Sequence, residues 1–291
     1  MVVATGFFDG VHLGHRELIK ELVSVAKKRC TDSLVITFQP HPRTVLYPQE
    51  KAPELLTSLD EKLRMLLDCG VDRVEVIDFT ESFSKLTAAE FINEYVVKMF
   101  GADALVMGYD NRLGCDLKGP CELMKEMSGS SFEISAAGRV DNAGLAVSST
   151  RIRRALTEGD MRLASEMLGY DYTLAGTVVH GQKLGRKLGF PTANLQLSEP
   201  LKLIPAHGAY AVRVRVLGKM YDGMCNVGVR PTVGGETPVI ESHIFDFDED
   251  IYGEKIEVSF IRRIRGERKF SGLDELRRQL EIDKKLCIFG K

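Results

Sequence analysis

Two histidines near the start of the chain, His12 and His15, could act together on an anionic ligand. They follow an apolar run, residues 2–4, and a glycine-rich stretch, and they precede apolar residues at helical spacing. This order predicts a strand, a turn and a helix whose first amides and dipole attract an anion. Residues i and i+3 share one face of a helix, so both imidazoles can reach one ligand. We expect Gly14 to leave space for a phosphate chain.

A second candidate phosphate site lies near the middle of the chain. Three hydroxyl residues, Ser148, Ser149 and Thr150, precede a helical pattern that contains Arg153. Serine and threonine cap helices well. Hydroxyls, free amides and an arginine together can also hold a phosphate. From the residues alone, a capped helix and a ligand site are equally good interpretations.

A histidine between two prolines, His41, is a third candidate. It follows a predicted buried strand, residues 34–38, and Pro40 and Pro42 stiffen the loop that carries it. Ligands of open α/β sheets bind at the carboxyl ends of the strands. The pattern therefore predicts either a ligand contact or a solvated histidine in a rigid loop.

Strands alternate with helices through the first half of the chain, which predicts a parallel, doubly wound α/β sheet. Capping boxes begin two of the helices, at Ser58 with Glu61 and at Thr87 with Glu90. We expect the second of these helices to end near Met99. The predicted strands are residues 2–4, 34–38, 74–77, 104–107 and 132–135.

The pattern changes near residue 169, where long helical periodicity gives way to short β-rich runs between turns. This spacing predicts an antiparallel barrel or sandwich. We therefore expect two domains, residues 1–168 and 169–291, and a closing helix over residues 273–280 that packs on the β structure. The β-rich runs are residues 174–179, 209–217, 221–227, 239–245 and 255–260.

Composition argues against several classes of protein. A net charge of −2 over 291 residues does not suggest a surface that binds nucleic acid. No apolar run in the sequence approaches the roughly 18 residues of a membrane span. The six cysteines are scattered and form no C-x-x-C pair, which favours free thiols in a reducing cytoplasm.

The stretch Gly-Phe-Phe-Asp-Gly-Val-His-Leu-Gly-His, residues 6–15, resembles the FAD synthetase branch of the adenylyl- and cytidylyltransferase superfamily. Residues 148–153 match the second signature of that superfamily. The resemblance implies that His12, His15 and Arg153 act on the phosphates of ATP. It also implies ATP or phosphate contacts at Gly6, Phe8, Asp9, Gly14, Ser148, Ser149 and Thr150.

The same resemblance extends to two flavin contacts. The Phe-Gln-Pro-His-Pro stretch implies that His41 lies near the substrates, and Asp110 matches a polar position of the family that contacts them. Phe7, Asn111 and Leu113 differ from the residues that are usual in the family. These differences concern flavin and ribose contacts and leave the phosphate-binding residues intact.

The second half closely resembles riboflavin kinase. Its signature matches Gly-Arg-Lys-Leu-Gly-Phe-Pro-Thr-Ala-Asn, residues 185–194, although a glycine loop by itself is more often a turn. The resemblance implies that Thr192 and Asn194 hold Mg2+ and that Glu241 accepts the proton of the ribityl 5′-hydroxyl. Further matches occupy residues 204–210, 226–232 and 241–247. Implied ATP contacts are Gly181, Gly185, Arg186, Gly189 and Pro191.

Together the resemblances imply a Rossmann-like α/β nucleotidyltransferase domain followed by an antiparallel β-barrel kinase domain. Such a multifunctional transferase would convert riboflavin and ATP to FMN and ADP, and FMN and ATP to FAD and pyrophosphate, with Mg2+. Two alternatives stay open: a riboflavin kinase with a weak or inactive adenylyltransferase domain, and a flavin-binding regulator. The expected partners are these flavins and nucleotides, without nucleic acid or membrane.

Overall fold

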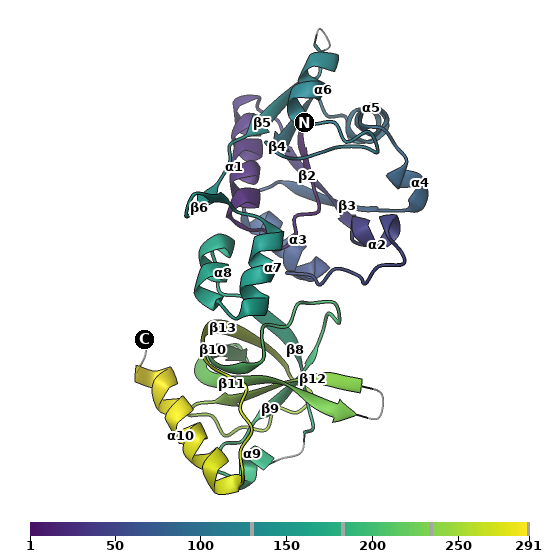
Figure 1. Cartoon of the computed structure of the whole chain (residues 1–291). Coiled ribbons are helices and arrows are strands. Elements are labelled where there is room, and N and C mark those ends of the chain that lie inside the picture. Colours follow the sequence, from purple (N-terminus) through teal and green to yellow (C-terminus); the bar gives the residue numbers. More distant parts are fainter. Residues whose placement is uncertain (129–130, 182–183, 233–234, 290–291) are drawn as a thin grey trace. The chain divides into compact units, whose positions relative to one another are not determined.

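The computed structural model describes residues 1–128, 131–181, 184–232 and 235–289 (Figure 1). Contacts within the chain divide it into two compact units, residues 1–149 and 150–291. The division falls at the start of helix α7 (Ser149–Glu158). Helix α8 (Met161–Leu168) therefore groups with the β structure that follows it.

The first unit is built on a five-stranded sheet in the order β3-β2-β1-β4-β5 (Figure 1). All of its strand pairs are parallel, and β1 is central, between β2 and β4. Val2, Val3 and Ala4 are fully buried in this central strand. The predicted parallel α/β fold is confirmed. The strands are β1 (Val2–Thr5), β2 (Ser33–Gln39), β3 (Arg73–Asp78), β4 (Ala104–Gly108) and β5 (Glu133–Ala137).

Helices pack on both faces of this sheet. Helices α1 (Leu13–Lys28) and α3 (Leu59–Asp68) share one apolar core with alternate residues of β1 and β2. The other residues of these strands face a second core, formed with α5 (Ala88–Phe91), the π-helix η1 (Ile92–Met99) and α6 (Pro120–Glu126). The central strands β1, β2 and β4 are thus buried on both faces, as their continuous apolar runs require.

Both predicted capping boxes are present. The Ser58 hydroxyl accepts a hydrogen bond from the Glu61 N–H at 3.2 Å, and the Glu61 carboxylate accepts one from the Ser58 N–H at 2.8 Å. Thr87 and Glu90 form the same pair of bonds, and the helix that they begin continues as η1. The remaining elements of this unit are α2 (Pro42–Leu46), α4 (Glu81–Ser84), β6 (Asp141–Asn142) and β7 (Leu145–Ala146).

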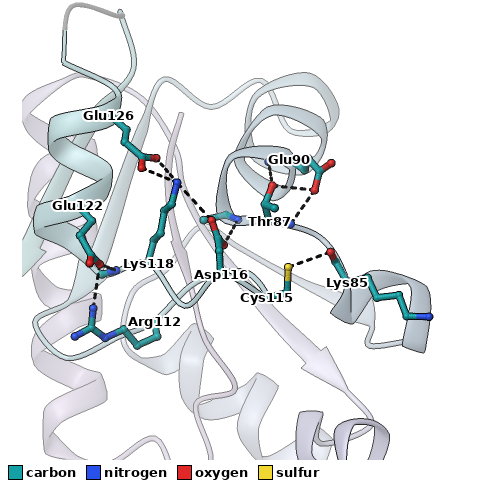
Figure 2. Close-up of polar contacts among 11 residues, drawn as sticks. Lys85, Thr87, Glu90, Arg112, Cys115, Asp116, Lys118, Glu122 and Glu126 are labelled. Atoms are coloured by element: carbon teal, nitrogen blue, oxygen red, sulfur yellow. Dashed lines mark hydrogen bonds and ion pairs between the residues drawn. The ribbon is translucent and has the colours of Figure 1, made fainter.

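The loop after β4 is fastened on two sides (Figure 2). Asp116 accepts a hydrogen bond from the Ala88 N–H at 2.8 Å, at the start of α5. Lys118 forms ion pairs with Asp116 at 3.4 Å and with Glu126 of α6 at 2.6 Å. A Cβ atom at Gly114 would lie 2.1 Å from the Ala88 nitrogen, so this close approach requires glycine. The loop at the carboxyl end of β4 therefore has a defined shape.

The second unit contains a closed antiparallel barrel in the order β10-β11-β12-β9-β8-β13 (Figure 1), which confirms the predicted barrel. Strand β9 was not predicted, because it is short and lies directly after the glycine-rich stretch. Helix α10 (Leu273–Phe289) runs beyond the predicted 273–280. The elements are β8 (Thr173–Val179), α9 (Leu184–Lys187), β9 (Ala193–Leu197), β10 (Gly208–Val216), β11 (Lys219–Thr232), β12 (Gly235–Ile244) and β13 (Lys255–Gly266).

Two further observations concern the whole chain. Among the described residues, no helix has both the length and the apolar character needed to cross a membrane. All six cysteines are free, and two of them, Cys225 and Cys287, are buried in the second unit.

Candidate active sites

The two predicted histidines meet at the start of α1. His12 is the N-cap of the helix, and its Nδ1 accepts a hydrogen bond from the His15 N–H at 3.3 Å. Their rings stack with centroids 3.6 Å apart. Because Nδ1 of His12 is an acceptor, the neutral ring carries its proton on Nε2. The sequence therefore placed the pair correctly at a helix start, although His12 caps the helix instead of lying within it.

His15 is held in its neutral form. Burial is the main cause that lowers its pKa well below the usual 6.5, and the nearby His12 and Lys62 lower this pKa further. The Nδ1 atom of His15 is enclosed and has no hydrogen-bond partner within the protein. An enclosed polar atom without a protein partner is costly unless a ligand or water satisfies it. Its position is therefore one where a bound ligand can supply the missing hydrogen bond.

The predicted glycines of this turn pack against its own rings. A Cβ atom at Gly14 would lie 3.2 Å from Cε1 of His12 and 3.6 Å from the Val147 carbonyl oxygen. A Cβ atom at Gly6 would lie 3.2 Å from the ring of Phe8, which itself packs edge-on against His15. Both glycines therefore allow the aromatic and imidazole rings to pack closely against the backbone.

Asp9, a predicted ATP contact, is buried and is bound to the chain. Its carboxylate accepts hydrogen bonds from the backbone N–H groups of Leu56 and Thr57 at 2.9 and 3.1 Å. Its carbonyl oxygen accepts one from the Ser149 hydroxyl at 3.0 Å. Asp9 thus joins the turn after β1 to the segment before α3 and to the predicted hydroxyl motif.

The hydroxyl motif is divided between the two units. Ser148 and Ser149 end the first unit, whereas Thr150 and Arg153 belong to the second, on α7. Thr150 is exposed and Arg153 is half-buried. Within the first unit the structure brings Ser149 to the turn that carries Asp9.

Sequence reasoning missed Lys62. This lysine lies in the first turn of α3 and is only 3% exposed. Its Nζ donates a hydrogen bond to the Phe7 carbonyl oxygen at 3.0 Å and lies 4.0 Å from the centroid of the Phe7 ring. One signal in the sequence could have found it: Lys62 stands one helical turn before the buried Leu66, on the apolar side of the helix.

The predicted flavin residues lie at the carboxyl ends of β2 and β4. His41 is the N-cap of α2, and its ring contacts the ring of Phe7 at a centroid distance of 4.2 Å. Asp110 is exposed in the loop after β4. Next to it, Asn111 donates a hydrogen bond to the Thr5 carbonyl oxygen at the end of β1, at 3.1 Å. The unusual Phe7 and Asn111 therefore both have defined contacts inside the unit.

In the barrel, antiparallel pairing brings two predicted residues together. The register between β12 and β9 sets Glu241 opposite Asn194. Neither residue is fully buried, so both side chains remain accessible. A Cβ atom at Gly181 would lie 2.3 Å from the amide nitrogen of Asn194, so Gly181 allows the chain to pass over this amide.

Thr192 lies between two cavities. The first, of about 330 Å³, is lined by Arg186, Pro191, Thr192 and the acidic segment 248–250, among others. The second, of about 240 Å³, is lined by Thr192, Glu241 and several apolar side chains. Thr192 is the residue that the linings of these two cavities share. The apolar residues of the second cavity include Leu188, Phe190, Met224, Phe270, Leu276 and Leu280.

The remaining predicted glycines shape the segment before Thr192. A Cβ atom at Gly185 would lie 2.2 Å from the Phe190 carbonyl oxygen. Gly189 has a φ of +83°, a left-handed conformation that favours glycine. These glycines fold the residues around α9 tightly against the start of β9.

Two further residues of the barrel site were not singled out from the sequence. Nδ1 of His243 lies 2.7 Å from the Pro191 carbonyl oxygen, and burial lowers the pKa of this histidine. Asp283 of α10 is buried and forms an ion pair with Arg265 at 2.8 Å. Both residues line the second cavity, so α10 forms part of its wall in addition to packing on the barrel.

A parallel sheet with a histidine-capped helix start and a barrel with a threonine that lines two cavities are compatible with a nucleotide-dependent transferase. The FAD synthetase family model matches residues 1–151, and the riboflavin kinase model matches residues 168–288. The chain belongs to the bifunctional riboflavin kinase/FMN adenylyltransferase family.

Relatives of this description match over nearly the whole chain. The enzyme of Listeria monocytogenes is 40% identical and the match covers 97% of this chain and 90% of that protein. The enzyme of Bacillus subtilis is 37% identical, with 99% and 91% covered. A solved structure described as a macrolide-efflux protein from Streptococcus pneumoniae superposes with a TM-score of 0.92 at 36% identity, covering 99% of this chain and 93% of that one.

The protein is therefore a transferase with two activities. It phosphorylates riboflavin with ATP to FMN, and it adenylylates FMN with ATP to FAD and pyrophosphate. The kinase-only and regulator alternatives are not favoured, because both family models match and the full-length relatives carry both activities in their names.

Proposed function

We propose that phosphoryl transfer to riboflavin takes place at Thr192, between the two cavities of the barrel. The observation that carries this proposal is that Thr192 lines both. The apolar side chains of the second cavity suit an isoalloxazine ring. Arg186 in the first cavity suits the phosphates of ATP. A donor in one cavity and an acceptor in the other would meet at the residue that they share.

In this proposal Glu241 is the proton acceptor for the ribityl 5′-hydroxyl, because its carboxylate lines the flavin cavity that Thr192 bounds. Thr192 and Asn194 would hold Mg2+. A hydroxyl and an amide oxygen are suitable ligands for this ion, and phosphates and water would supply the others. The bound ion would neutralise negative charge on the phosphates. Gly181, Gly185 and Gly189 shape the segment that presents these ligands.

For adenylyl transfer we propose that His12 and His15 bind the phosphates of ATP through neutral N–H groups. The enclosed Nδ1 of His15, without a protein partner, supports this role. Arg153 and the 148–150 hydroxyls would stabilise the leaving pyrophosphate. The reaction needs positioning and charge neutralisation and no covalent nucleophile. His41 and Asp110, at the strand ends, are proposed to contact the flavin.

We further propose that residues 1–168 carry adenylyl transfer and residues 169–291 carry the kinase. The enzyme would act in the cytoplasm, and its six free cysteines support a reducing compartment.

The test incubates each variant with riboflavin, ATP and Mg2+ and separates the flavins by chromatography. Thr192→Val, which keeps the shape and removes the hydroxyl, should slow FMN formation yet still convert supplied FMN to FAD. His15→Ala should accumulate FMN. FMN formation by Thr192→Val at the wild-type rate would overturn the assignment of Thr192.

A further inference from the structure

Lys62 is a buried cation that contacts the turn leading to the residues proposed for adenylyl transfer. Its ammonium donates to the Phe7 carbonyl oxygen at 3.0 Å and lies 3.5 Å from the Phe38 carbonyl oxygen at the end of β2. The Thr37 hydroxyl donates to the same Phe7 oxygen at 3.1 Å. Lys62 therefore joins α3, the turn after β1 and the end of β2.

We propose that Lys62 is a positioning residue for adenylyl transfer, whose ammonium fixes the turn that sets the two histidines. The turn follows β1 directly and leads into the N-cap His12. Phe7 receives the ammonium on its carbonyl and on its ring. The next residue, Phe8, packs its ring against His15. A change at Lys62 thus reaches His15 through two consecutive residues of the turn.

The same contact reaches the proposed flavin side. The Phe7 ring lies 4.0 Å from Nζ of Lys62 and 4.2 Å, between centroids, from the ring of His41. A cation near an aromatic ring is attracted to it most strongly where water is excluded. Lys62 therefore holds a ring that stands between α3 and the N-cap of α2.

Several ionisable groups face Lys62. Asp9, in the turn, favours the ammonium, whereas burial disfavours it, and burial dominates. On α1, His15 lies close enough for Lys62 to contribute to the lowered pKa of His15, and the ring of His12 stacks on that of His15. His41 faces it across the Phe7 ring. The balance lowers the pKa of Lys62 from 10.5 to about 8, so this ammonium loses its proton just above neutral pH.

The proposal is tested on the chain of 291 residues by its two activities. Lys62→Met keeps most of the length of the side chain and removes the charge, and Lys62→Arg keeps the charge. Arg64→Met is the matched control, because Arg64 is exposed on the same helix. Initial rates of FMN adenylylation and of riboflavin phosphorylation are measured from pH 6 to pH 10. Because the kinase uses the same ATP, its rate serves to correct the adenylylation rate for ionisation of the nucleotide.

For the wild type, the ratio of kcat/KM for adenylylation to kcat/KM for riboflavin phosphorylation should fall above about pH 8. Lys62→Met should lose at least about tenfold at pH 7 and show no further fall with pH. Lys62→Arg should have a higher adenylylation rate than Lys62→Met and should keep this rate to a higher pH than the wild type does. Nuclear magnetic resonance should show a higher pKa for His15 in Lys62→Met, because a nearby positive charge has gone. Arg64→Met should match the wild type.

The proposal is overturned if Lys62→Met keeps the wild-type rate and pH profile. Equal losses in Lys62→Met and Lys62→Arg, with the pH profile unchanged, would also overturn it and show a packing role. If Lys62→Met does not fold, the pH profile of the wild type decides. A ratio of adenylylation rate to kinase rate that stays constant up to pH 9 would reject the proposal.

Discussion

The two sites proposed for this enzyme are built in different ways. In the α/β unit, His12, Asp9 and Lys62 are each 5% exposed or less, and backbone or ring contacts hold all three. In the barrel, Thr192, Asn194 and Glu241 are partly exposed, and Thr192 and Glu241 line cavities. The residues of the first site lie in the interior of the α/β unit. Those of the second lie at the surface of the barrel, where two strands and a turn meet.

This difference predicts how each site responds to substitution. Polar groups in an interior are coupled to folding, because an unsatisfied partner costs free energy wherever water is excluded. Polar groups that face a cavity can change with little effect on stability. Substitutions that remove a buried polar group from the α/β site should therefore alter activity and stability together, and those in the barrel site should alter activity alone.

The largest effect is expected for Glu241→Gln. Loss of the proposed proton acceptor should lower kcat of the kinase by about 1,000-fold with little change in KM for riboflavin. The temperature of unfolding should stay near that of the wild type. Steady-state kinetics and a thermal melt measure both quantities.

Glu254→Gln provides the matched control, since Glu254 is exposed on the same unit just before β13. It should leave the kinase unchanged. If Glu241→Gln raised KM as strongly as it lowered kcat, Glu241 would be a binding residue and not the base.

His15→Ala should lower adenylyl transfer by about 100-fold, because it removes a phosphate contact that is stronger in the transition state. The kinase of the same protein should be unaffected. The pKa of His15 is well below 6.5, so the dependence on neutral His15 should leave the wild-type rate flat from pH 6.5 to 7.5. A rate that climbs through that interval would show that a different ionisation controls the step.

Gly14→Ala should lower adenylyl transfer by about tenfold, because the new Cβ meets the His12 ring at 3.2 Å and must displace it. Alanine favours a helix over glycine by about 1 kcal/mol, so stability should not fall in parallel. Gly138→Ala is the control, as a Cβ there meets nothing within 4 Å. Equal rates for both variants would show that the site tolerates a displaced His12.

The last expected effect is a change of stability with pH, which itself changes neither activity directly. The folded pKa of Lys62 is about 8 and its ordinary value is 10.5, so between these values the unfolded chain binds more protons and stability rises with pH. Relative to Lys62→Met, the wild type should gain up to about 3 kcal/mol in unfolding free energy across this window. Urea unfolding at several pH values measures it. Parallel curves for the two proteins would refute the lowered pKa.

The elements of the α/β unit could be predicted because their signals are local. The capping box of Ser58 and Glu61 lies within four residues, and the strand before His12 is continuously apolar. The role of Lys62 could not be predicted in this way, because its acceptor Phe7 is 55 residues away. The same holds for Asn111, which reaches Thr5 over 106 residues.

In the barrel, the sequence indicated Thr192, Asn194 and Glu241 through resemblance alone. Strand register, which depends on long-range pairing, sets Glu241 opposite Asn194. Strand β9 could not be predicted for the same reason. Its five residues beside a turn carry too little periodicity to indicate pairing with β12 and β8.

The hydrogen bond that makes His12 the N-cap of α1 limits which residues evolution can place there. Asparagine and aspartate are better caps than histidine and would preserve the helix, but neither carries an imidazole to stack on His15. A complete set of substitutions at position 12 should therefore rank differently when selected for folding than when selected for FAD synthesis. Substitution at position 12 is restricted because few amino acids can both cap α1 and stack on His15.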